Sequence, residues 1–202
     1  MTLWRGATPL ILASQSASRR TVLQQAGIDF LAVPAGVDER RLQRESALHD
    51  AGAIAKLLAR EKAREVAACY PDHVVIGADQ TLAVGDVLLS KPAGRAQAAT
   101  QLKQLAGKTH ELHSAVAIVR DDIVLFDTVS TARLAMRPLS DAEIESYLDA
   151  AGDKVTTSVG AYQIEGLGIH LFDRIDGDHF TILGLPLLPL LDFLRRQGLL
   201  AF

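Results

Sequence analysis

The chain has 202 residues, of which 49% are hydrophobic and 22% are charged, and its formal net charge is −3. This length suits one sizeable domain or two small lobes around a cleft, with a core in either case. The charge lacks the basic field that duplex nucleic acid requires, so we expect no nucleic acid polymer as a partner. A small polyanion held by a few local cations stays open.

The cysteine content and the apolar segments indicate where the chain works. Cys69 is the only cysteine, so no intrachain disulfide can form. The first residues show no signal-peptide core, and the apolar segment 181–194 is interrupted by glycine and proline and is too short for a bilayer span. We therefore expect a cytoplasmic protein without a membrane partner.

Apolar periodicity and turn residues predict strands that alternate with helices. Ser140 and Glu143 form a capping box at the start of one of these helices. Because hairpins interrupt the alternation, we expect an α/β fold with a mixed sheet, formed by residues 1–202 as one domain without a linker. In chain order we expect a strand at 10–13, a helix at about 18–26, an irregular stretch at 34–38, a helix at about 50–68, a strand at 73–80, a hairpin of 82–84 and 87–89, a helix at 95–105, strands at 110–119 and 123–136, a helix at about 141–150, a polar loop at 152–166, a strand at 168–175, and a closing helix at 186–196.

A serine-rich turn follows the first predicted strand. Ser14, Ser16 and Ser18 precede Arg19 and Arg20 at the start of the first helix. Free backbone amides, the positive end of the helix dipole and planar guanidinium groups together suit a phosphate chain. The alternative is that Ser18 caps the helix while both arginines extend into solvent, and the residues alone favour neither.

Asp79 follows a short apolar run and is predicted at the end of a buried strand. Open α/β sheets place their ligands beyond the carboxyl ends of strands, although an isolated Asp there more commonly caps a turn. Lys62 shares an apolar helical stripe, so it either extends along the core edge to solvent or points into a cleft. Lys91 lies in a loop, and of the adjacent loop carboxylates Asp38 and Glu39 at most one is expected to act as a metal ligand or acid/base group.

Several kinds of site are absent from the sequence. It contains no P-loop, no Gly-x-Gly-x-x-Gly motif and no nucleophile elbow. His110 and His113 point to opposite faces of a predicted strand, which argues against joint zinc binding. The remaining inventory of cations and carboxylates is what metal-assisted attack of water on a polyphosphate needs.

Eight segments, in their order and spacing, resemble the motifs of the Maf nucleotide pyrophosphatases over nearly the whole chain. The resemblance implies a hydrolase that cuts a nucleoside triphosphate between the α and β phosphates with a divalent cation, Mg²⁺ or Mn²⁺. It also implies an elongated, two-lobed fold like that of the inosine triphosphate pyrophosphatases, with a central nucleotide cleft, and an association with septum formation. It leaves open whether the chain forms a homodimer. The segments are residues 10–20, 37–39, 61–63, 76–80, 91–92, 107–110, 160–166 and 184–186.

Carried over by position, the resemblance assigns a role to nine residues. Asp79 is the implied general base, and Asp79 and Glu39 are the implied catalytic and metal-binding carboxylates. The residues that the resemblance places against substrate are Ser14, Ser16, Arg19, Lys62, Lys91, Gln80 and Glu165.

The chain departs from the common family pattern at positions that bear on the base. Ala17 and Ser18 replace the Pro and first Arg of many members. Gln80 and Glu165 are closer to the 7-methyl-GTP group, whereas residues 160–162 are closer to the dTTP/UTP enzymes. A carboxylate facing the base would accept hydrogen bonds from a guanine edge and repel the carbonyls of thymine or uracil. A nucleotide-binding regulator of cell division with little hydrolysis is the alternative function.

Overall fold

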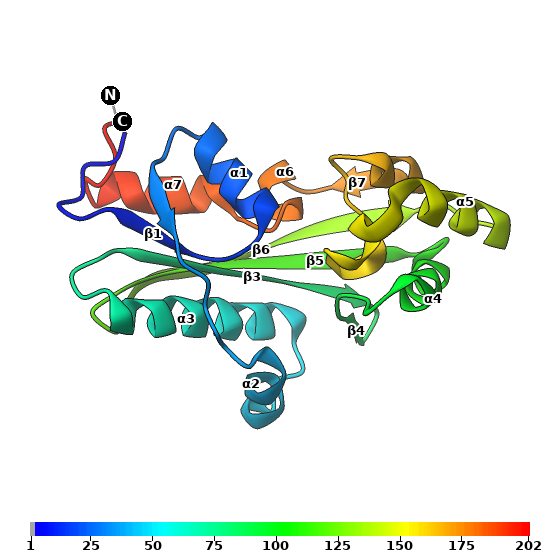
Figure 1. Cartoon of the computed structure of the whole chain (residues 1–202), viewed down its shortest axis with the longest axis horizontal. Coiled ribbons are helices and arrows are strands. Elements are labelled where there is room, and N and C mark those ends of the chain that lie inside the picture. The colour runs from blue at the N-terminus through cyan, green and yellow to red at the C-terminus, as the bar shows by residue number, and fades with distance from the viewer. Residues whose placement is uncertain (1–2) are drawn as a thin grey trace. The chain divides into compact units, whose positions relative to one another are not determined.

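The chain, in a computed structural model that describes residues 3–202, is built on a seven-stranded mixed sheet (Figure 1). The strand order is β2-β1-β3-β5-β6-β7, and β4 also pairs with β3. β1 is parallel to β2 and β3, whereas β4 and β7 pair antiparallel, so the predicted mixed sheet is confirmed. The strands are β1 (Leu10–Ala13), β2 (Phe30–Ala32), β3 (Val75–Val84), β4 (Val87–Leu89), β5 (Thr109–Arg120), β6 (Ile123–Met136) and β7 (Phe172–Asp176).

Helices connect most of the strands, and no helix in residues 3–202 is long and apolar enough to cross a membrane. The α-helices are α1 (Ala17–Gln25), α2 (Glu39–Ser46), α3 (Ala51–Cys69), α4 (Arg95–Leu105), α5 (Asp141–Ala151), α6 (His179–Ile182) and α7 (Leu187–Arg196). The short 3₁₀ helices are η1 (Gly152–Thr156), η2 (Val159–Ala161) and η3 (Leu167–Leu171).

The chain divides into two compact units, in line with the two lobes that the resemblance implies. The first unit comprises the chain up to Gln80, His113–Thr131 and Asp178–Phe202. The second comprises Thr81–Leu112 and Ala132–Gly177. Elongation, a central cleft and a single domain over residues 1–202 stay predictions.

Alternation along β3 sends side chains of the first unit to two different layers. Ile76 and Ala78 pack in the buried cluster that includes Leu190 of α7, on the face where Figure 1 shows α1 and α7. Val75 packs with Ala63 of α3 on the opposite face. The same alternation therefore sends Asp79 and Gln80, the next residues of β3, to different faces.

Gly77 lets α3 lie directly against β3. A Cβ atom at Gly77 would lie 2.0 Å from the carbonyl oxygen of Ala59 and 2.8 Å from the amide of Ala63, distances that no side chain allows. Ala59 and Ala63 belong to a row of alanines spaced four residues apart, which keeps this face of α3 flat. The row is Ala55, Ala59, Ala63 and Ala67.

The second unit contains the predicted capping box and a buried aromatic cluster. Ser140 accepts from the amide of Glu143, whose side chain accepts from the Ser140 amide, which starts α5 as predicted. His110 lies against Tyr162 and Phe172, and its Nε2 is 2.6 Å from the Tyr162 hydroxyl oxygen. Its Nδ1 is buried without a hydrogen-bond partner among the described residues.

The structure corrects two of the expected elements and adds others that were not predicted. The strand predicted at 73–80 continues to Val84, so Asp79 lies within β3 and not at its tip. Residues 168–175 form η3 before β7, and residues 179–182 form helix α6 behind the N-cap Asp178. β2 and α2 were not predicted, because β2 has only three residues and α2 buries none of its side chains.

Candidate functional site

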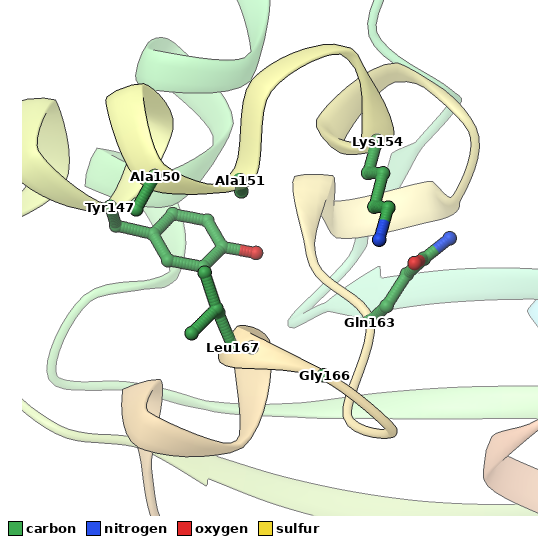
Figure 2. Close-up of a pocket in the computed structure, with 8 residues that line it drawn as sticks. Tyr147, Ala150, Ala151, Lys154, Gln163, Gly166 and Leu167 are labelled. Atoms are coloured by element: carbon green, nitrogen blue, oxygen red, sulfur yellow. The ribbon is translucent and has the colours of Figure 1, made fainter.

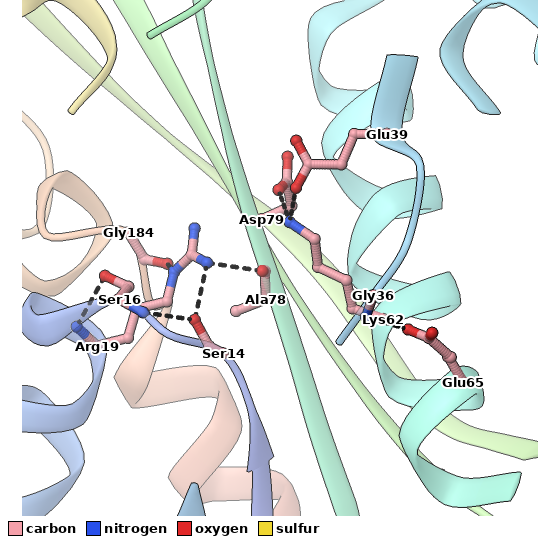
Figure 3. Close-up of polar contacts among 10 residues, drawn as sticks. All are labelled: Ser14, Ser16, Arg19, Gly36, Glu39, Lys62, Glu65, Ala78, Asp79 and Gly184. Atoms are coloured by element: carbon pink, nitrogen blue, oxygen red, sulfur yellow. Dashed lines mark hydrogen bonds and ion pairs between the residues drawn. The ribbon is translucent and has the colours of Figure 1, made fainter. Parts of the chain in front are cut away.

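The turn before α1 is organised by its hydroxyl groups (Figure 3). Ser16, and not Ser18, is the N-cap, and its Oγ accepts from the Arg19 amide at 3.4 Å. Ser14 Oγ accepts from the Ser16 amide at 3.2 Å and from Arg19 Nη1 at 3.4 Å. Both oxygens act as acceptors in these contacts, so both hydroxyl protons remain available for donation.

Arg19 turns into the protein, whereas Arg20 is exposed. Its Nε donates to the Gly184 carbonyl oxygen and its Nη1 to the Ala78 carbonyl oxygen, each at 2.8 Å. The pairing of β1 with β3 ends at Ala13 and Gly77, so Arg19 binds a β3 carbonyl just beyond the reach of β1. No hydrogen bond within residues 3–202 involves its Nη2, which stays available for a ligand.

Asp79, Lys62 and Glu39 form a second cluster in the same unit. Lys62 Nζ lies 2.5 Å from Asp79 Oδ1 and 2.6 Å from Glu39 Oε1 (Figure 3). The side chains of Asp79 and Lys62 are 9% and 13% exposed, whereas that of Glu39 is 52% exposed. Lys62 therefore points inward to carboxylates and does not extend along the core edge to solvent.

The pKa shifts of Arg19 and Asp79 show that the charges of the two clusters interact. Burial raises the pKa of Asp79, and the charges of Lys62 and Arg19 oppose that rise. Burial likewise lowers the pKa of Arg19, and Asp79 and Glu39 oppose that change. A guanidinium starts from so high a pKa that Arg19 stays charged. The site thus presents a charged arginine next to a carboxylate that binds protons more readily than an ordinary Asp.

Local structure explains how the second cluster forms. The close approach at Gly77 puts α3, and with it Lys62, against the strand that carries Asp79. Asp38 caps α2, so Glu39 is the first residue of a helix and not a loop residue as predicted. Glu65, three residues after Lys62 on α3, accepts from the amide of Gly36 at 2.7 Å and fastens the segment that leads into α2.

Gln80 faces away from the second cluster. Its Nε2 lies 2.8 Å from Ser114 Oγ and 3.1 Å from the carbonyl oxygens of both Thr181 and Ile182. Ser114, which sequence reasoning missed, is fully buried and donates to the Thr181 carbonyl at 2.6 Å. The substrate contact predicted for Gln80 stays a prediction.

Lys91 and Glu165 belong to the second unit, and both are exposed. Their predicted substrate contacts stay predictions. The second unit also contains a cavity of about 160 Å³, in which Figure 2 shows Lys154 and Gln163 opposite the ring of Tyr147. None of the nine predicted residues lines it. The lining residues are Tyr147, Ala150, Ala151, Lys154, Gln163, Gly166, Leu167 and Gly168.

The carboxylates of the first unit suit a divalent cation only in part. Within residues 3–202 no three or more His, Cys, Asp or Glu side chains are grouped so that they could hold a metal ion. Asp79 and Glu39 nevertheless converge on one point, the Lys62 ammonium. Mg²⁺ is commonly bound by one or two carboxylates together with substrate phosphates and water, so this pair fits such a cation once a phosphate chain is present.

Comparison with known proteins shows the family. The sequence model described as Maf-like protein matches residues 9–197. The chain belongs to this family. The resemblance seen in the motifs is thereby confirmed over nearly the whole chain.

Full-length relatives in this family carry activity names. A protein of Rhodopseudomonas palustris, named nucleoside triphosphate pyrophosphatase, is 64% identical over 201 residues, which is 100% of both chains. A protein of Bradyrhizobium diazoefficiens with the same name is 62% identical over the same share of both chains. A protein of Rhizobium johnstonii, named 7-methyl-GTP pyrophosphatase, is 50% identical over 94% of this chain and 96% of its own.

A solved structure of a HAM1 protein from Coxiella burnetii is a more distant match. It is 16% identical, with a TM-score of 0.38, over 63% of this chain and 72% of that one. A match at this level carries no weight for the function or for the arrangement of the units.

Proposed function

We propose that this Maf-like chain is a nucleoside triphosphate pyrophosphatase, which hydrolyses the bond between the α and β phosphates and releases a monophosphate and pyrophosphate. The names of its full-length relatives support this activity. The observation that carries the proposal is the meeting, within one compact unit, of the arginine-bearing turn of α1 with the cluster of Asp79, Lys62 and Glu39.

The turn before α1 would hold the phosphate chain. Arg19 keeps its Nη2 for a phosphate oxygen, while its other contacts fix the plane of the guanidinium. The hydroxyl protons of Ser14 and Ser16 add two donors near the N-terminus of a nine-residue helix, where the helix dipole favours anions. These groups would bind charge that develops on the phosphates during hydrolysis.

Asp79 would act as the general base. Its Oδ1 contacts Lys62, so its Oδ2 can accept a proton from water. Burial raises its pKa, which makes it a stronger base than an exposed Asp, while the charge of Lys62 opposes that rise and favours the ionised form. Lys62 also offsets the repulsion that two carboxylates would exert on a phosphate chain.

A divalent cation would be held by Asp79 and Glu39. It would neutralise charge on the phosphate oxygens and assist the attack of water. Loss of turnover on chelation, with recovery on Mg²⁺ or Mn²⁺, is the expected behaviour.

The proposal extends to the residues that contact the nucleobase of the substrate. Glu165 would favour a guanine edge, because a carboxylate accepts hydrogen bonds and a pyrimidine edge adds carbonyl acceptors. The name of the relative from Rhizobium johnstonii makes 7-methyl-GTP the first modified nucleotide to test. Lys91 would contribute a further phosphate contact.

The test is a panel of ordinary and modified triphosphates with Mg²⁺ or Mn²⁺, in which pyrophosphate and orthophosphate are measured separately. Asp79→Asn should lower turnover by about 10²–10⁴-fold, the range for loss of a general base, and retain nucleotide binding. Asp127→Asn is the matched control. Asp127 is also a largely buried carboxylate in the first unit, where it pairs with Lys56 and Arg60 of α3 and not with Lys62.

Three outcomes would contradict the proposal or a part of it. Orthophosphate as the first product would indicate a different bond cleavage. Nucleotide binding that stabilises the protein without any turnover in Mn²⁺ would favour the nucleotide-binding regulator. Equal losses in Asp79→Asn and Asp127→Asn would remove the special role of Asp79.

A further inference from the structure

The carbonyl oxygen of Gly184 accepts a hydrogen bond from Arg19 Nε, and the neighbouring residues restrict the direction in which this carbonyl points. Gly184 directly follows α6 and its Leu183 C-cap, and its φ of 90° lies in the left-handed region, which favours glycine. A Cβ atom there would lie 3.3 Å from Arg19 Nε and 3.7 Å from the Gln80 amide carbon. The carbonyl direction at this residue therefore depends on how α6 ends.

Two side chains, those of Gln80 and Ser114, form hydrogen bonds with backbone carbonyl groups at the end of α6. The last carbonyls of a helix lack partners within the helix, and here Gln80 and Ser114 supply them. Thr181, only 1% exposed, has a carbonyl oxygen that accepts from Gln80 Nε2, Ser114 Oγ and the Gly184 amide. Buried carbonyl groups with several donors have little freedom to turn.

We propose, on the basis of the function proposed above, that Gln80 and Ser114 are positioning residues for Arg19. They fasten the end of α6, α6 sets the direction of the Gly184 carbonyl, and that carbonyl fixes Arg19 Nε so that Nη2 faces the phosphate chain. Gln80 thus acts on the opposite face of β3 from its neighbour Asp79, through Arg19 rather than through a base contact.

The first test measures the arginine directly and needs no turnover. In protein with ¹⁵N-labelled arginine, the Nε–H signal of Arg19 is assigned by its loss in Arg19→Lys, and its exchange with water is then measured. Gln80→Met should speed that exchange by about tenfold, because the restraint on Arg19 Nε should weaken by about the free energy of one hydrogen bond. Ser114→Ala, which removes a single oxygen, should act in the same direction and serves if Gln80→Met does not fold.

Gln101 provides a matched control. It is 4% exposed, and its Nε2 donates to the carbonyl oxygen of Ser90 at 2.7 Å in the second unit. Gln101→Met makes the same chemical change to another buried glutamine that holds a backbone carbonyl. Arg19 exchange that stays at the wild-type rate in Gln80→Met and Ser114→Ala, or rises equally in Gln101→Met, would overturn the proposal.

The second test uses turnover in a double-mutant cycle. Gln80→Met should lower kcat/KM in the wild-type background and cause no further loss in an Arg19→Ala background. A direct base contact would instead produce a loss in both backgrounds that differs between triphosphates, and this result would overturn the positioning role. If the wild-type chain releases no pyrophosphate, the proposed function fails, while the exchange measurement still decides the role of Gln80.

Discussion

At the residue scale, burial and the charge of Lys62 act in opposite directions on the pKa of Asp79. The ammonium is the largest charge that opposes the burial of Asp79, and at 2.5 Å it favours the ionised carboxylate. In the proposed function Asp79 is the general base and must be ionised, so the rate should fall as pH drops through the pKa of Asp79. Because burial raises that pKa, the acid limb of the rate profile should lie above the range of an ordinary Asp.

Replacing this lysine should therefore move the pH profile. In Lys62→Met, the pKa of Asp79 should rise further, and the acid limb of kcat/KM should shift to higher pH, with a lower rate at neutral pH. The profile is measured with excess metal, from pyrophosphate release at a series of pH values. Lys56→Met is the control, since Lys56 lies on the same helix and pairs with Asp127. An unshifted limb would mean that Lys62 does not face Asp79 during turnover.

At the element scale, the contact between α3 and β3 determines whether Lys62 can reach Asp79. Gly77→Ala would force a methyl group against the Ala59 carbonyl, so α3 must move away or the backbone must distort. We expect a loss of about 1–3 kcal/mol in the free energy of unfolding, together with lower turnover. Urea denaturation and the pyrophosphate assay measure the two effects.

Gly94→Ala is the control for that substitution. Gly94 has an extended backbone, with φ of 178°, and a Cβ atom there would meet nothing within 4 Å. Its variant should retain turnover. A Gly77→Ala protein with wild-type turnover would show that the separation of α3 from β3 does not govern the site.

Local patterns in the sequence predicted the long elements and missed those that depend on distant partners. The helix predicted at about 50–68 and the strands predicted at 110–119 and 123–136 agree closely with α3, β5 and β6. The prediction ended β3 too early because Asp79 and Gln80 are polar. Their partners, Lys62 and α6, become neighbours only in the folded chain.

The same limit applies to the candidate site. Motif resemblance selected Ser14, Ser16, Arg19, Lys62, Asp79 and Glu39, and the structure brings these six together in one unit, while their roles stay predictions. The carbonyl groups of Ala78 and Gly184 could not be found in this way, because a backbone carbonyl has no side-chain signature. Residues 184–186 were part of the matched motifs, and this was the one available signal for Gly184.

At the scale of the whole molecule, His110 should make stability depend on pH. Burial lowers its pKa from 6.5 to about 4, so the folded chain keeps His110 neutral where the unfolded chain protonates it. The stability that neutral His110 contributes should be fully present above pH 6.5. As pH falls from there toward about 4, the free energy of unfolding should decrease by about 3 kcal/mol. His110 lies against Tyr162 in the second unit, whereas Asp79 and Glu39 belong to the first, so we expect the effect to be separate from those carboxylates.

His110→Gln tests this dependence, because glutamine can still bond to the Tyr162 hydroxyl but does not titrate. Its free energy of unfolding, measured by urea denaturation between pH 4 and 7, should change less with pH than that of the wild type. His49→Gln, at an exposed position, should keep the wild-type slope. Parallel slopes for wild type and His110→Gln would rule out His110 as the source.

Arg19 donates to the carbonyl oxygen of Ala78 in β3, one residue beyond the last residue of β3 that pairs with β1. In the proposed function the same side chain also binds a phosphate, so natural variation at this position should be limited by both roles. Lysine keeps the charge but cannot reproduce the planar fork that reaches two carbonyls at once. Divergence toward new nucleotides within this lineage should therefore accumulate elsewhere in the chain, with position 19 among the last to drift.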